Sequence, residues 1–245
     1  MTEDAWSESL RGDSREIEEL VHCGLGEVKD DLDRNAVSVL IYRSTPEVLN
    51  RAMNLSMSVA PLERQLGAEI LGQFGCFEGP QSISCFRETV DRLLDMLSRE
   101  DDPGVLNSIC VGLGHRGDSR SVVAISPLKN HPDESVRFGV VFGLLHHDEM
   151  TANQTLIELT RDPSSDVRDW ATFALGTLRN FDTPELRESL WRRVSDDDED
   201  TRWEAITGLA RRGDDRILPL LIHEFRQPTV LELAIEAAGE LGSPR

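Results

Sequence analysis

The chain has 245 residues, enough for one elongated domain or two compact ones. Hydrophobic residues make up 39% of it and charged residues 29%, a balance that excludes wholesale disorder. Its 45 acidic residues outnumber 26 basic ones, and the formal charge of −19 opposes binding to a phosphate backbone. No apolar run reaches the roughly 18 residues that span a bilayer, and Met1 to Leu10 carry no secretory signal. We therefore expect a cytoplasmic protein that binds neither nucleic acid nor a membrane.

Segments with helical spacing of apolar residues follow one another along the chain in pairs. The first members cover residues 14–25, 46–58, 86–99, 119–130, 152–161, 184–194 and 216–225. The second members share one pattern, clearest where Asp166, Val167 and Arg168 precede the triplet 174–176, Ala-Leu-Gly. With Leu175 as the marker, copies stand at residues 40, 71, 113, 144, 175, 209 and 238. Most steps are close to 31 residues, which fits two short helices with two turns; the longer step predicts a surface loop at 74–85.

Each pair is predicted to be an α-hairpin whose apolar stripe is buried only when the next pair stacks on it. Small residues at Gly67, Gly139, Ala171 and Ala205 are expected to let the stacked helices approach closely. The prediction is an all-α fold, a single domain over residues 1–245 with about seven repeats at approximately 14–43, 46–76, 85–117, 119–147, 152–180, 184–213 and 216–242.

The Asp-Val-Arg start and the Ala-Leu-Gly end of the pattern resemble short HEAT-like repeats of the phycobilisome-lyase type. This resemblance implies a right-handed α-solenoid whose second helices line the concave face. It also implies that Arg64, Arg137, Arg168 and Arg202 form a stacked ladder that bonds to turn carboxylates of neighbouring repeats. It selects no single function, because such repeats occur in adaptors, bilin lyases, DNA glycosylases and a di-iron hydroxylase.

Acidic residues gather in the turns within the hairpins, which a solenoid places along one edge. Single acids there are interpreted as helix caps. A run of five exceeds what capping needs: Asp196, Asp197, Asp198, Glu199 and Asp200. The opposite edge is predicted to be basic, with Arg43, His115, Arg116, Arg120, His146, His147, Arg179, Arg211, Arg212 and Arg216.

Two aligned positions of the second helices carry aromatic residues where such repeats usually have polar ones. These residues are Phe138, Phe142, Phe173 and Trp203, with Trp170 and Asp169 beside them. Exposed aromatic clusters mark interaction surfaces, whereas a modest rotation of each helix would bury the same side chains in the core. Our hypothesis is that this cluster and the acidic run bind a basic or amphipathic segment of a protein partner.

The leading functional prediction is a non-enzymatic scaffold, adaptor or regulator that binds this partner on its concave face. Two alternatives stay open: a bilin-lyase-like or chaperone subunit acting with a partner chain, and an acidic immunity-type inhibitor of a basic toxin. We predict no catalytic residue and no cofactor. His115, His146 and His147 are candidate metal ligands because they lie in consecutive turns between hairpins. Their spacing fixes no coordination geometry, so no metal is predicted.

Overall fold

The computed structural model describes Leu10 and residues 12–76 and 83–242. Helices and turns make up this part of the chain, which contains no strand. It divides into two compact units, Met1–Gly143 and Leu144–Arg245. The predicted all-α solenoid of helical hairpins is confirmed. Within the described ranges, no helix has both the length and the hydropathy needed to cross a membrane.

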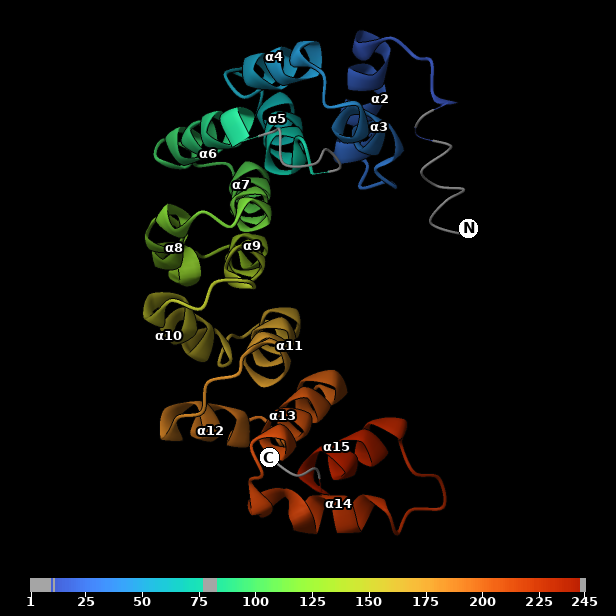
Figure 1. Ribbon diagram of the computed structural model, residues 1–245, viewed down its shortest axis with the longest axis vertical. Helices are drawn as coiled ribbons and strands as arrows, with labels where there is room; N and C mark the ends of the chain where they lie inside the picture. The colour runs from blue at the N-terminus through green and yellow to red at the C-terminus, as the bar shows by residue number, and fades with distance from the viewer. Residues whose placement is uncertain (1–9, 11, 77–82, 243–245) are drawn as a thin grey trace. The chain divides into compact units, whose positions relative to one another are not determined.

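The first unit consists of successive hairpins (Figure 1). They pair α2 (Ile17–Lys29) with α3 (Asn35–Arg43), α4 (Pro46–Leu55) with α5 (Pro61–Gln73), α6 (Ile83–Leu97) with α7 (Pro103–Arg116), and α8 (Ser119–Ile125) with α9 (Glu134–Leu144). A 3-10 helix, Ser126–Asn130, extends α8. The loop predicted at 74–85 is only partly described, because residues 77–82 lie outside the described part. Its first residue, Phe74, is buried, and α6 begins at Ile83, so neither end of the predicted range belongs to a surface loop.

The second unit continues the same alternation. It pairs α10 (Met150–Leu159) with α11 (Ser165–Phe173), α12 (Pro184–Trp191) with α13 (Glu199–Arg211), and α14 (Leu218–Glu224) with α15 (Glu232–Gly242). A π-helical turn, Ala174–Leu178, extends α11, and a 3-10 turn, Asp215–Ile217, precedes α14.

The marker position of the repeat is a core position. Six marker leucines, at positions 40, 71, 113, 144, 175 and 209, are at most 1% exposed. The seventh marker, Ala238, is half-buried. The helical spacing read from the sequence therefore identifies the face of each second helix that packs inward.

Local sequence signals explain where several helices begin. Thr45 and Thr183 each precede a proline at the first helical position, and their hydroxyls accept hydrogen bonds from backbone amides in the first turn. The carboxylates of Asp102 and Asp198 cap α7 and α13 in the same way. Capping was thus correct for Asp102, whereas Asp198, which was assigned to the acidic run, also caps a helix.

Arg168 ties its own hairpin turn to the next hairpin. Its Nη1 donates to the backbone carbonyls of Asp162 and Pro163, at 2.9 and 3.1 Å. Its Nε and Nη2 donate to the two carboxylate oxygens of Asp196 in the following hairpin, at 3.0 and 2.8 Å. A planar guanidinium that binds a carboxylate in this bidentate way fixes the orientation of both groups. One side chain therefore sets the register of two hairpins.

The same interaction recurs along the chain. Arg64 donates to two carbonyls of its turn and forms a bidentate pair with Glu100, at 2.7 and 2.8 Å. Arg137 and Arg202 likewise donate from Nη1 to two carbonyls of their own turns. Arg34, which is not among the four predicted ladder arginines, pairs with Glu69 of the next hairpin at 3.1 Å. The predicted arginine ladder is confirmed for the pairs that reach a neighbouring carboxylate.

The edge that was predicted to be basic exposes fewer positive charges than expected. Arg116, Arg179 and Arg212 are buried there rather than exposed. They donate to the backbone carbonyls of the marker residues one hairpin earlier, at 2.6, 2.8 and 2.9 Å, namely Leu71, Leu144 and Leu175. Arginine at these positions satisfies carbonyls that lack a partner at the end of a helix. Their charges are therefore used inside the fold, and the predicted basic edge is wrong for these three residues.

Close helix approach tests this packing directly. A Cβ added to Gly208 would lie 2.6 Å from the Cα of Gly176, whereas one added to Gly239 would meet no heavy atom within 4 Å. We predict that Gly208→Ala lowers the free energy of unfolding by about 1–3 kcal/mol, because backbone has to move. Gly239→Ala should be neutral or raise it by up to about 1 kcal/mol, because alanine favours the helix. Urea denaturation of both variants measures the difference, and equal effects would contradict the close approach.

Candidate partner-binding surface

The predicted partner-binding residues lie on second helices and divide between the two units. Phe138 and Phe142 are on α9; their rings are half-buried, with centroids 4.8 Å apart. The others are on or beside α11 and α13 of the second unit: Asp169, Trp170, Phe173, Asp196, Asp197, Asp198, Glu199, Asp200 and Trp203. Acidic and aromatic side chains thus occur together in the second unit, where the candidate site is built.

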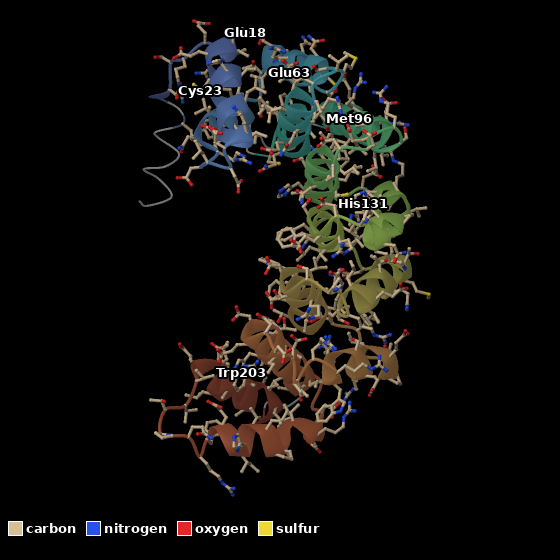
Figure 2. All side chains as sticks on the ribbon, turned by 180° about the vertical axis from the view of Figure 1, so that it is seen from behind. Glu18, Cys23, Glu63, Met96, His131 and Trp203 are labelled. Carbon is tan, nitrogen blue, oxygen red and sulfur yellow. The ribbon has the colours of Figure 1, made fainter. Side chains whose placement is uncertain are left out.

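The aromatic residues of the second unit take different positions. Trp170 and Phe173 on α11 are half-buried and meet edge to face, with centroids 5.6 Å apart at 81°. Trp203, which is labelled in Figure 2, lies on α13. Its side chain is only 7% exposed. The core alternative therefore holds for Trp203, and the surface consists of Trp170 and Phe173.

The acidic run separates into structural and exposed members. Asp196 is buried and accepts hydrogen bonds from Arg168 and Arg193. Burial opposes its ionisation, but the hydrogen bonds from Arg168 and from the backbone amide of Asp198, together with the charges of Arg168 and Arg193, outweigh burial and hold the pKa of Asp196 below its ordinary value. Asp198 is occupied as the cap of α13. The side chains left for a partner are those of Asp197, Glu199 and Asp200, which are exposed.

Asp169 has an environment that the sequence did not reveal. Its Oδ1 is buried and has no hydrogen-bond donor among the described residues. Burial raises the pKa of this carboxyl to about 7, and the negative charges of Glu204, Asp198 and Asp200 add to the effect. A cationic side chain next to Asp169 would donate a hydrogen bond to its Oδ1 and would place a positive charge among the surrounding carboxylates.

Glu204 on α13 is the residue that sequence reasoning missed. Burial raises its pKa, while a hydrogen bond donated by Thr177 Oγ1 at 3.1 Å and the charge of Arg211 act in the opposite direction. A lone glutamate on a helix is ordinarily solvated, so the residue type alone did not indicate a site. The signal that could have identified Glu204 is its alignment with Trp170 one repeat earlier, next to the position of Asp169.

The histidines are not gathered into a ligand set. His147 is buried with its Nδ1 3.3 Å from a carboxylate oxygen of Glu149, whereas His115 and His146 are exposed. Nowhere in the described ranges do three His, Cys, Asp or Glu side chains come together in a way that could hold a metal ion.

Comparisons with known proteins agree with this architecture. Residues 90–176 and 123–202 match a family model described as HEAT repeats. Protein YibA of Escherichia coli K12 is 38% identical over 108 residues; this match spans 44% of the chain and 38% of that relative. The X-ray structure of E. coli YibA has a TM-score of 0.77 at 25% identity, over 99% of this chain and 87% of that one. A HEAT-like repeats protein of the archaeon Thermococcus onnurineus NA1 shares the fold, with a TM-score of 0.55 at 14% identity over 94% and 97% of the two chains.

The chain is therefore a HEAT-like repeat protein. The match is to HEAT repeats in general, and the finer resemblance to the phycobilisome-lyase type stays a prediction. The names of the relatives give no activity, substrate or partner. What the fold defines is a repeat scaffold.

The raised pKa of Asp169 predicts a pH-dependent effect of Asp169→Asn. A carboxyl with a pKa near 7 in the folded state and near 4 in the unfolded state loses stability as the pH rises between these values. The amide carries no such penalty, so the variant should gain about 1–3 kcal/mol over the parent at pH 8 and little at pH 4, after discounting for solvent screening. Denaturation curves at both pH values measure this gain. The exposed-site control Glu236→Gln should show no comparable dependence, and a gain of Asp169→Asn that is equal at both pH values would contradict the assignment.

Proposed function

We propose that this chain is a protein-binding scaffold whose second unit accepts a basic side chain of its partner at the face of α11 and α13. The observation that carries this proposal is the buried Oδ1 of Asp169, which has no donor within the described part of the chain. An unsatisfied buried acceptor costs roughly 1–3 kcal/mol. A lysine or arginine of the partner would remove that cost.

The surroundings of Asp169 favour a cation over any neutral donor. Glu204 and Asp200 lie close enough to raise its pKa, and the exposed carboxylates of Asp197 and Glu199 belong to the same acidic run. In a chain with a formal charge of −19, these groups attract positively charged partners over a distance of about one Debye length. The acidic face therefore supports both the capture and the orientation of a basic segment.

The aromatic pair supplies an apolar contact beside the carboxylates. Trp170 and Phe173 are on the helix that carries Asp169, and both remain half-buried. Aromatic anchors next to charged groups are the usual centres of binding energy in protein interfaces. A segment that places an apolar residue next to its lysine or arginine would contact both features at once.

An acidic immunity-type inhibitor of a basic toxin is one specific form of this function, and the same face would serve it. A bilin-lyase-like or chaperone role gains no support from the residues of this face. An immunity-type inhibitor requires tight, salt-sensitive capture of a single basic protein, whereas an adaptor would capture more than one partner.

Partner capture tests the proposed function. The immobilised chain, the double variant Asp169→Asn with Glu204→Gln, and a charge-matched control, Glu88→Gln with Asp101→Asn, are each exposed to lysate of the source cells. Bound proteins are then identified by mass spectrometry. Basic proteins held by the parent and the control should be reduced about tenfold or more on the Asp169 and Glu204 variant, since each lost charged contact is worth about 1.5–3 kcal/mol. Equal capture by all three chains, or capture of acidic proteins only, would contradict the proposal.

The same complex should depend on pH. Because a cation binds the ionised form of Asp169, affinity for the captured partner should rise as the pH increases through about 7, the pKa of Asp169. Calorimetric titration at pH 6 and pH 8 measures this change. The Asp169→Asn variant should lose the pH dependence as well as affinity; an unchanged pH dependence in that variant would show that another group is responsible.

A further inference from the structure

A hollow of about 490 Å³ in the second unit has four arginines among its eight lining residues. It lies where the turn between α10 and α11 meets the turn between α12 and α13. Its lining consists of Arg161, Asp162, Arg168, Arg192, Arg193, Ser195, Asp196 and Asp197. Four guanidinium groups around one hollow stand out in a chain with 45 acidic and 26 basic residues.

The two buried carboxylates of this lining are already engaged within the fold. Asp196 accepts from Nε and Nη2 of Arg168 and from Nη1 of Arg193, the last at 2.8 Å. Asp162 is buried, and one of its oxygens accepts the backbone amide of Ser164 at 2.9 Å. Arg168 uses its remaining Nη1 on turn carbonyls. Arg168, Asp162 and Asp196 therefore form the frame of the hollow.

The other arginines retain donors that nothing in the described ranges uses. The Nε of Arg193 is buried and has no hydrogen-bond partner. Arg161 is exposed and makes no ion pair with a described residue. Among the described acidic residues, Arg192 forms an ion pair with Glu188 alone, with 3.6 Å between Nε and the carboxylate. A buried N–H without an acceptor is unfavourable, so a ligand that offers an acceptor to these donors would be favoured.

We propose that this hollow binds an oxyanion, a phosphate or carboxylate group of a small molecule. The guanidinium fork matches both groups in geometry, and it does so better than a point charge such as an ammonium. The volume lies within the usual range for small-molecule sites and exceeds what one inorganic ion needs. The site is centred on these arginines and not on Asp169. It lies at the turns within the hairpins, which the sequence predicted to form an acidic edge.

Asp197 sets a condition on the ligand. It is exposed, lines the same hollow and donates no hydrogen bond when ionised, so it repels an incoming anion. Its presence therefore favours an anion that reaches the arginines from the side away from Asp197. Removing this charge should tighten binding, whereas removing charge from Arg161 or Arg192 should weaken it.

Calorimetric titration with two probes tests the site: inorganic phosphate for the tetrahedral source and citrate for the carboxylate source. Both are used at fixed ionic strength with chloride as the balancing ion, which removes general screening. The parent chain should bind at least one probe; the probe that binds more tightly identifies the source. Arg161→Gln with Arg192→Gln should reduce its affinity about tenfold or more, and Asp197→Asn should increase it. These three residues are exposed, so the variants preserve the buried frame.

Arg226→Gln is the matched control, an exposed arginine of the same unit outside the hollow, and it should leave affinity unchanged. Thermal unfolding of each variant without ligand checks that the fold is retained. Absence of binding by both probes at millimolar concentration would overturn the proposal, and so would equal loss of affinity in the control. Neither result bears on partner capture, which is tested by the Asp169 and Glu204 variants and not by changes to the arginines of the hollow.

Discussion

The bidentate contact between an arginine and a carboxylate of the next hairpin is the interaction on which this fold depends. Each hairpin alone exposes an apolar stripe, and stacking buries it without specifying how far one hairpin is rotated or shifted against the next. Arg168 removes that freedom because it holds its own turn through two carbonyls and the next turn through Asp196. Arg64 does the same with Glu100. The packing of the buried marker leucines follows from this register.

The distribution of charge over the molecule is a consequence of the same design. Ladder arginines are bound to turns and carboxylates, and Arg116, Arg179 and Arg212 are bound to the ends of second helices. Few guanidinium groups remain to neutralise the acids on α11 and α13. Asp169 and Glu204 are therefore left with raised pKa values, and the hollow with spare arginine donors contrasts with the acidic residues around it. Both proposed sites consist of groups that the structural ion pairs do not use: the carboxylates of Asp169 and Glu204 in one, and spare arginine donors in the other.

Much of the fold was predictable from the sequence because helical spacing reports directly on burial. The period of the marker identified hairpins, and the resemblance to HEAT-like repeats implied the ladder for the arginines at the start of the second helices. Side-chain burial within a helix was less accessible: a small rotation decides whether Trp203 enters the core, and spacing does not determine that angle. The Asp169 environment required knowing that Glu204 of the next hairpin lies beside it, which is a tertiary fact. The hollow likewise joins two turns about 30 residues apart in the sequence.

A double-mutant cycle on Arg168 and Asp196 tests the central claim most directly. Both single alanine variants and the double variant are compared by urea denaturation, alongside the same cycle for the exposed pair Arg192 and Glu188. The Arg168–Asp196 pair should show a coupling energy of about 2 kcal/mol or more, against about 0.5 kcal/mol or less for the exposed pair. If the coupling energy of Arg168 and Asp196 were as small as that of the exposed pair, packing of the apolar stripes alone would set the register.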